Sequence, residues 1–393
     1  MQKDYSPFAP GQPIAPEFFV GRAQQVQILI NRVQRSLSNR IEVVFVSGER
    51  GIGKTSLARF VHRYAEQHMD VVGTHVHLGG VQDINEAIRR TIERILQESA
   101  GKPWHQRLLS PVRKYVREIG VLGVTIAFHP PPDQLQGMAQ YFPQEIQRIL
   151  SIIHESHALL IIWDDINGLA QQESFALWFK SFVDETARRR VPLCFVMIGL
   201  EELRRMMIRN NESLARVFYP LEIPLWNEEE CREFFQQAFQ RVNTRVEKHA
   251  LDMMVAFSGG HPALAHEIGD AVFLTDKDGV IDLEDAVQGI RSAAEIVGRK
   301  YLDPQVLSAL RSQRYRSILH KLATIDFGFR FYRSEVLRHL SEGEKRVFDN
   351  FLRRMRNLGV IRTARERGRG AYEFVNILHY LYFSMEAKAQ RPG

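Results

Sequence analysis

The stretch Ile41 to Thr55, IEVVFVSGERGIGKT, decides the fold of this 393-residue chain. Its first seven residues form an apolar run of strand length, as expected for a parallel strand covered on both faces. A glycine-rich turn then leads into a predicted helix over residues 56–67. The turn fits the pattern G-x-x-x-x-G-K-[ST], in which backbone N–H groups curl around a phosphate. The sequence therefore predicts a phosphate-binding loop.

The residues of this loop have separate expected roles. The predicted nucleotide contacts are Gly48, Glu49, Arg50, Gly51, Ile52, Gly53, Lys54, Thr55 and Ser56. Lys54 is expected to bridge the β- and γ-phosphates of ATP and to act in catalysis, and the Thr55 hydroxyl to ligate Mg²⁺. The helix N-terminus adds its partial positive charge. We therefore predict ATP or ADP and Mg²⁺ as the bound groups.

A second apolar run, residues 158–164, ends in the two carboxylates Asp164 and Asp165. Burying two like charges is costly without a cation. We therefore assign Asp164 to the Mg²⁺ site, through water, and Asp165 to catalysis, where it would polarise the attacking water. The alternative for Asp165 is that it merely caps the helix expected after Asn167.

Helix and strand signals alternate through the first part of the chain. An amphipathic helix is predicted over residues 24–37. Strands beyond the two already described are predicted over residues 71–77, 192–198 and 221–225. Helical stretches separate them, which indicates an α/β fold with a mostly parallel sheet. Residues 101–135 break the pattern with a basic helix over 112–119 and a strand over 120–128, and are interpreted as an insertion without an assigned role.

The C-terminal quarter is strongly basic. Residues 291–393 hold 21 Lys and Arg against 10 Asp and Glu, a net charge of +11, whereas the other 290 residues carry −5. Helices are predicted over 315–324, over 334–340 and from Ser341 onward, followed by a hairpin of 360–363 with 372–375. This order resembles a winged helix-turn-helix, whose third helix enters the major groove of DNA. The predicted DNA contacts are Arg346, Arg353, Arg365, Arg367 and Arg369.

The composition of the chain limits which classes of protein it can belong to. A hydrophobic content of 45% with 25% charged residues is ordinary for a globular protein. Two cysteines, Cys194 and Cys231, make no disulfide framework, and a cytoplasmic location is expected. No signal peptide or membrane span is recognisable, because the longest apolar stretch, residues 119–128, is about half of what a membrane span needs.

The phosphate loop and the paired aspartates resemble an AAA+/STAND-type P-loop ATPase, closest to archaeal-type ATPases and the origin-recognition initiator ATPases. Phe19, Val20, Gly21 and Arg22 resemble the F-x-G-R box of that family, which implies a place beside the adenine. The segment 214–218 resembles the one that carries an arginine finger, which implies that Arg216 acts in trans across a subunit boundary of a homo-oligomer. The segment 259–262 resembles the G-x-P motif of STAND proteins, which implies a nucleotide contact by Pro262 at the start of a lid helix.

The resemblance covers about residues 15–300 and extends to the C-terminal winged helix. It implies an N-terminal arm (1–17), a P-loop core (18–225), a helical lid (226–302), a winged-helix domain (303–385) and a tail (386–393). Residues 226–300 are predicted to be helical throughout, with Asn227 and Glu230 in capping-box spacing. Two departures from the family are visible. Asp165 replaces the usual glutamate, which predicts slow hydrolysis, and no Arg follows Pro262 on the lid helix, where His261 is a candidate phosphate sensor.

Three functions fit this sequence. The first is an ATP-dependent assembly that binds DNA. The second is a STAND-type switch that regulates a partner effector, for example in defence signalling, with the winged helix as an intramolecular gate. The third is a nucleotide-binding scaffold whose hydrolysis is incidental. The excess of arginine in the C-terminal quarter favours the first.

Overall fold

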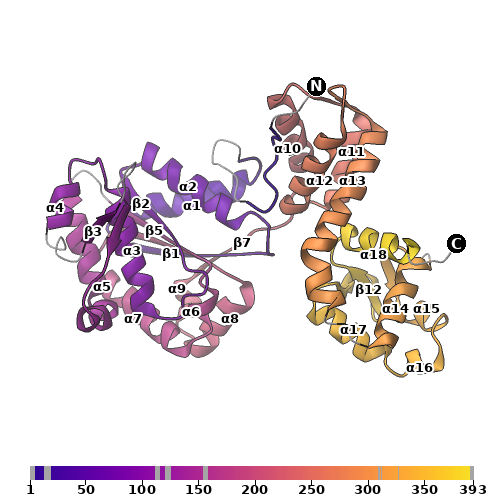
Figure 1. Ribbon diagram of the computed structural model, residues 1–393. Helices are drawn as coiled ribbons and strands as arrows, with labels where there is room; N and C mark the ends of the chain where they lie inside the picture. The colour runs from indigo at the N-terminus through magenta and orange to yellow at the C-terminus, as the bar shows by residue number, and fades with distance from the viewer. Residues whose placement is uncertain are drawn as a thin grey trace. The chain divides into compact units, whose positions relative to one another are not determined.

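The computed structural model describes residues 5–12, 19–110, 116–119, 125–153, 158–308, 310, 312–325 and 327–389. The predicted N-terminal arm, insertion and C-terminal tail therefore fall partly outside the described residues. The chain divides into two compact units, residues 13–224 and residues 1–12 together with 225–393 (Figure 1). No helix within the described ranges is long and apolar enough to cross a membrane.

A five-stranded sheet forms the centre of the first unit. Its order is β2 (Val71–His77), β5 (Ala158–Asp164), β6 (Leu193–Ile198), β1 (Ile41–Ser47) and β7 (Tyr219–Glu222). Each pair of neighbouring strands is parallel. The predicted α/β class with a mostly parallel sheet is therefore confirmed.

Helices cover both faces of this sheet (Figure 1). One face carries α1 (Ala23–Ser36) and α2 (Lys54–His68), and the other carries α3 (Ile84–Glu98), α5 (Pro132–Ile153) and α7 (Glu173–Arg188). Neighbouring strand residues alternate between the two apolar cores, so Val44 packs with α1 and α2 while Phe45 packs with the opposite helices. Because both faces are buried, the strands are apolar throughout.

Two predictions about strands and helices in this unit are wrong. The last strand runs from Tyr219 to Glu222 rather than over 221–225, because it pairs with β1 from Val44 onward and Pro224 has no N–H to donate. The predicted helix over 112–119 is contradicted at its end, where β3 (Val116–Ile119) pairs antiparallel with β4 (Thr125–Phe128). The remaining helices of the unit are α4 (His105–Leu109), α6 (Asn167–Ala170), α8 (Glu201–Asn210) and α9 (Leu214–Val217).

A long-range anchor explains the β3–β4 pair. Arg89 on α3 donates to the carbonyl oxygen of Phe128 at 2.9 Å, and the Phe128 N–H donates to Glu93 at 3.2 Å. These bonds join the end of β4 to a helix some forty positions earlier in the chain. The local pattern of basic and apolar residues cannot reveal such a contact, because strand formation depends on packing against neighbouring parts of the fold.

The second unit begins with a helical bundle. It comprises α10 (Glu228–Arg241), α11 (Lys248–Ser258), α12 (Pro262–Thr275), α13 (Leu283–Val297) and the π-helix η3 (Gly298–Leu307). The predicted capping box is confirmed, since Asn227 accepts from the N–H of Glu230 at 2.8 Å and Glu230 accepts from the N–H of Asn227 at 3.0 Å. The prediction of helices alone is wrong, because β8 (Arg245–Val246) and β9 (Val280–Ile281) pair in parallel. Each has two residues, which is too short for a periodic signal.

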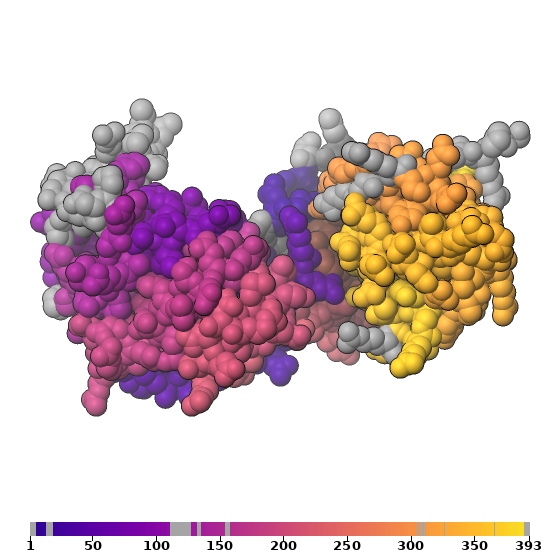
Figure 2. Space-filling model, turned by 90° about the horizontal axis from the view of Figure 1, so that it is seen from below, coloured from indigo at the N-terminus to yellow at the C-terminus, as the bar shows by residue number. Residues whose placement is uncertain are grey.

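The C-terminal part of this unit combines helices with a three-stranded sheet. Its elements are α14 (Gln313–Thr324), β10 (Arg330–Tyr332), α15 (Arg333–Leu337), α16 (Glu342–Lys345), α17 (Phe348–Asn357), β11 (Ile361–Thr363), η4 (Arg365–Arg367), β12 (Ala371–Phe374) and α18 (Ile377–Ala389). The predicted hairpin is present as β11 and β12, and β10 joins it in the order β10-β12-β11. Strand β10 was not predicted, and the third helix is split into α16 and α17. The orange to yellow surface in Figure 2 belongs to this part of the chain.

The N-terminal residues 5–12 pack on the helical bundle of the second unit (Figure 1). Phe8 is 6% exposed, and its ring centroid lies 5.0 Å from that of Phe239. The backbone N–H of Ala9 donates to Nδ1 of His266 at 3.2 Å. Burial lowers the pKa of His266 to about 4, which keeps the ring neutral and able to accept this bond near pH 7. A Cβ on Gly269 would lie 2.3 Å from the Phe8 ring, so the glycine makes room for it.

We expect Phe8→Ala to release this segment. Truncating a fully buried phenylalanine costs about 3–5 kcal/mol, which is enough to open residues 5–12 without unfolding the bundle. Amide hydrogen exchange of Ala9 and of the neighbouring turn of α12 should therefore accelerate by two orders of magnitude or more, roughly. Tyr5→Ala is the matched control, because Tyr5 is 74% exposed. Unchanged protection in Phe8→Ala would show that the segment is held by other contacts.

Candidate functional site

The glycine-rich loop adopts the backbone geometry that its sequence predicts. It joins β1 to α2, and Gly51 and Gly53 have positive φ angles of 78° and 96°, which strain other residues. A Cβ on Gly48 would lie 2.9 Å from the carbonyl oxygen of Ile223, so this position is also restricted to glycine. Helix α2 begins at Lys54 and points its N-terminus at the loop. This arrangement suits a phosphate, which backbone N–H groups and the helix terminus stabilise together.

Lys54 is held over the loop. Its Nζ atom donates to the carbonyl oxygens of Gly48 at 2.9 Å and Glu49 at 2.7 Å. Burial lowers the pKa of Lys54, while the charges of Asp164 and Asp165 act in the opposite direction. The ammonium group is therefore fixed between the loop and the two carboxylates, where an anionic group would meet it.

Asp164 ends β5 and is 3% exposed. Burial by itself would raise the pKa of Asp164, but hydrogen bonds from His75 and Thr55 and the charge of His75 outweigh burial and hold it below its usual value. The carboxylate is therefore ionised, and it lines the same cavity as Thr55. Oxygen donors of this kind are what Mg²⁺ prefers, so Thr55 and Asp164 fit the metal predicted from the sequence.

Asp165 has an unusual backbone conformation. Its φ angle is 59°, a left-handed value that is strained for a residue other than glycine and is found mainly at functional sites. Asn167 donates from Nδ2 to Asp165 Oδ1 and accepts from the N–H of Leu200 at 3.4 Å. The N-cap of α6 is Ile166, so the capping alternative for Asp165 is wrong. Asn167, which the sequence analysis did not select, instead fixes the carboxylate.

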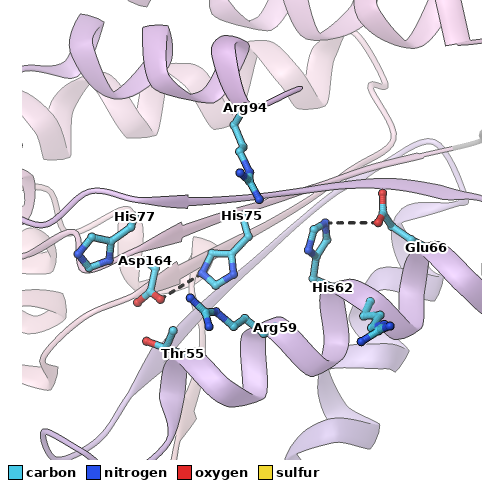
Figure 3. Close-up of a pocket in the computed structure, with 9 residues that line it drawn as sticks. Thr55, Arg59, His62, Glu66, His75, His77, Arg94 and Asp164 are labelled. Carbon is cyan, nitrogen blue, oxygen red and sulfur yellow. Dashed lines mark hydrogen bonds and ion pairs between the residues drawn. The ribbon is translucent and has the colours of Figure 1, made fainter. Parts of the chain in front are cut away.

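A cavity of about 630 Å³ extends from Thr55 and Asp164 along α2 (Figure 3). Its lining comes from α2, β2, α3 and β5 and consists of Thr55, Arg59, His62, Arg63, Glu66, His75, His77, Arg94 and Asp164. The sequence analysis missed His75 and His77. Their spacing of two on a predicted strand places both on one face. What the sequence could not show is that β2 pairs with β5, in a register that puts His77 opposite Asp164.

The predicted adenine box lies against the phosphate loop. Arg22 is 4% exposed and donates from Nη2 to the carbonyl oxygen of Ile52 at 3.4 Å. Phe19 stacks on Phe60 of α2 with a centroid distance of 5.1 Å, and Val20 is buried. Arg22 and Gly21 both have positive φ angles. The box is therefore part of the site, although its contact with a base stays a prediction.

The other predicted site residues lie elsewhere. Arg216 is exposed on α9, and its side chain forms no hydrogen bond or ion pair with any residue that the structure describes. Pro262 is the first residue of α12, and His261 is its N-cap. Both belong to the second unit, and their contact with a nucleotide stays a prediction. The predicted DNA contacts Arg346, Arg353, Arg367 and Arg369 are exposed, and the side chain of Arg365 lies outside the described residues.

Comparisons with known proteins agree with this geometry. Residues 19–196 match the family model described as an AAA ATPase domain. Among solved structures, a Walker-type ATPase of Pyrococcus abyssi has a TM-score of 0.58 at 13% identity, with 93% of this chain and 96% of that chain covered. The ORC2 protein of Aeropyrum pernix in its ADPNP–ADP complexes has a TM-score of 0.56 at 13% identity, with 99% of this chain and 96% of that chain covered. No curated protein sequence matches the chain.

At this identity the solved structures show a shared fold, while the family model places the phosphate loop and Asp164 inside one recognised domain. The match ends at residue 196, within β6 and before α10 of the second unit. Residues 19–196 therefore match the model of an AAA ATPase domain, and the chain resembles the Walker-type ATPase of Pyrococcus abyssi and the ORC2 protein of Aeropyrum pernix in fold.

Proposed function

We propose that this protein binds ATP with Mg²⁺, hydrolyses it slowly, and couples its nucleotide state to self-assembly and DNA binding. The observation that carries the nucleotide site is that Thr55 and Asp164 line one cavity beside the glycine loop. Lys54 would hold the β- and γ-phosphates, and a bound Mg²⁺ would neutralise phosphate charge there. The adenine would lie near Phe19 and Arg22.

Slow hydrolysis is proposed from Asp165. A general base must reach the attacking water, and an aspartate side chain is one methylene shorter than the glutamate of the family. The Asp165 carboxylate also accepts a hydrogen bond from Asn167, which holds the carboxylate close to the backbone of Asp165. Both features favour retention of ATP over rapid turnover.

The proposal of DNA binding rests on unequal pairing of arginines in the second unit. Arg330 and Arg362 both bind Glu373, and Arg333 binds Asp349, so each of these arginines has an acidic partner. By contrast, Arg367 and Arg369 at the β11–β12 turn are exposed and have no ion pair with a described residue. Unpaired arginines on a protruding turn suit the phosphates of a DNA duplex.

Assembly is proposed from Arg216. An exposed arginine whose side chain has no partner among the described residues can complete a nucleotide site of a neighbouring copy, where it would stabilise charge on the transferred phosphoryl group. Arg204, also a nearby basic residue, is instead paired with Glu201 at 2.6 Å. This difference supports Arg216 as the residue that acts in trans.

A STAND-type switch with an intramolecular gate is the second candidate. It is favoured by the packing of α18 against η3, where a Cβ on Gly298 would lie 2.2 Å from the ring of Tyr382. The Tyr382 hydroxyl also donates to Asp303 at 2.5 Å. These contacts tie the C-terminal helices to the helical bundle, as an internal gate would require.

Mass measurement of the purified protein tests the proposal. The first function predicts a larger particle with ATP, and a further increase with duplex DNA. A monomer under both conditions that retains tightly bound nucleotide would support the switch. A mass unchanged by ATP or DNA, with no retained nucleotide, would contradict both.

The triple variant Arg365→Ala, Arg367→Ala and Arg369→Ala should weaken binding to every duplex sequence about equally. The slope of log affinity against log salt should flatten by up to roughly 0.9 per lost phosphate contact. ATP affinity should stay unchanged, because the phosphate loop lies in the other unit. Fluorescence anisotropy over a salt series measures both quantities.

A second triple variant controls for net charge. Lys102→Ala, Arg107→Ala and Arg148→Ala removes three exposed positive charges from the first unit. This control should leave the salt slope close to that of the parent protein. Equal slopes for all three proteins would contradict phosphate contacts by the β11–β12 turn, and faster nucleotide release in the first variant alone would favour the gate.

A further inference from the structure

His75 lines the cavity beside Asp164 and has no assigned role. It lies on β2, and its Nε2 atom is 3.1 Å from Oδ2 of Asp164 on the neighbouring strand (Figure 3). Both side chains are buried, with exposed fractions of 11% and 4%. A histidine buried against the carboxylate that is assigned to Mg²⁺ needs a physical explanation.

The sheet fixes the relative position of the two residues. In the parallel register of β2 and β5, His75 is opposite Ile162 and His77 is opposite Asp164. The His75 ring therefore reaches diagonally across the strand pair toward the end of β5. Because both backbones belong to a buried sheet, the hydrogen bond restricts the side-chain rotation of Asp164 rather than the position of either strand.

The direction of the hydrogen bond follows from charge. An ionised carboxylate has no hydrogen to give, so the Nε2 nitrogen of His75 must donate. That bond occupies one lone pair of Oδ2. This bond from β2 thus restricts the Asp164 carboxylate and leaves Oδ1 and the remaining lone pair of Oδ2 available.

We propose that His75 is a positioning residue that orients Asp164 for Mg²⁺. The inference rests on the proposed binding of Mg·nucleotide at the loop. His75 would touch neither the metal nor the nucleotide and would act only through the carboxylate. Outer-shell partners of this kind typically change metal affinity by about 10–100-fold when they are removed.

The test measures Mg²⁺ dependence directly. Binding of a fluorescent ADP analogue is titrated against free Mg²⁺ for the parent protein, His75→Ala and His75→Gln, and is repeated in EDTA. His62→Gln is the control, because His62 lines the same cavity and its nearest carboxylate is Glu66, at 3.9 Å. If His75→Ala does not fold, His75→Met replaces it, since methionine fills the space without a donor.

We expect the half-saturating Mg²⁺ concentration to rise about tenfold or more in His75→Ala. Affinity in EDTA should stay within about twofold of the parent value, because the phosphate loop is untouched. His75→Gln should recover most of the loss, since its amide can donate to Oδ2 from a similar reach, and His62→Gln should match the parent.

Three results would overturn the inference. They are a parental Mg²⁺ midpoint in His75→Ala, a His75→Gln variant as impaired as His75→Ala, or an equal loss of affinity in EDTA, which would indicate general damage. A parent protein that binds no fluorescent ADP overturns the proposed function as well. Mg²⁺-dependent binding by the parent with an unchanged midpoint in His75→Ala overturns the role of His75 alone.

Discussion

Lys54→Ala is expected to abolish ATP turnover and to weaken ATP binding by about 2–5 kcal/mol, the usual cost of removing one partner from a buried charge pair. This corresponds to a loss of affinity of roughly 30-fold to several thousandfold. The reason is geometric, because the Lys54 ammonium lies over the loop carbonyls of Gly48 and Glu49 and faces the two aspartates. Titration with a fluorescent ATP analogue and an assay of phosphate release measure the two effects.

The control for this variant is Lys102→Ala, which removes an exposed lysine of the same unit. It should bind and hydrolyse ATP like the parent protein. Unchanged Mg·ATP hydrolysis in Lys54→Ala would contradict the assignment of residues 48–55 as the phosphate-binding loop.

Replacing Asp164 and replacing Asp165 should impair different steps of nucleotide binding and hydrolysis. Asp164→Asn should weaken Mg²⁺-dependent nucleotide binding, because it removes a buried carboxylate charge from the metal site. Asp165→Asn should keep ATP bound and slow hydrolysis by about 10²–10⁴-fold, the usual contribution of a general base. Single-turnover hydrolysis and nucleotide affinity, measured on both variants, separate the roles.

Asp165 contributes strain as well as charge, and Asn tolerates its left-handed backbone angle. Folding should therefore be preserved in Asp165→Asn. Equal losses of nucleotide affinity in the two variants would contradict the division between metal binding and water activation.

The parts of the fold that could be predicted are those that local patterns determine. Strands β1 and β5 were predicted to the residue, because a strand buried on both faces is apolar along its whole length. The phosphate loop is equally local, since its glycines and its lysine are consecutive in the chain. The capping box at Asn227 depends on a spacing of three residues.

The parts that could not be predicted depend on distant contacts. Strand β3 forms against β4, which is anchored on α3, and β10 pairs with residues some forty positions later. The hydrogen bond of His75 to Asp164 spans 89 positions and requires β2 to be the neighbour of β5. A sequence shows which residues form strands, whereas the order of the strands in a parallel sheet is set by their crossovers and packing.

The left-handed conformation of Asp165 is a separate case. Nothing in the run of residues 158–165 distinguishes its backbone from that of Asp164, because both are acidic residues at a strand end. The bonds that accompany this conformation come from Asn167, which itself bonds to the N–H of Leu200 after β6. At functional sites a strained backbone is often stabilised by residues that are distant in the sequence, and local sequence patterns then do not predict it.

The central claim is that the loop of residues 48–55 binds a nucleotide with Mg²⁺ held by Thr55 and Asp164. Calorimetric titration of the full chain with ATP, in Mg²⁺ and again in EDTA, tests this claim most directly. We expect one ATP to bind per chain, and to bind clearly more tightly in Mg²⁺ than in EDTA. Absence of binding heat under both conditions, for protein shown to be free of retained nucleotide, would contradict it.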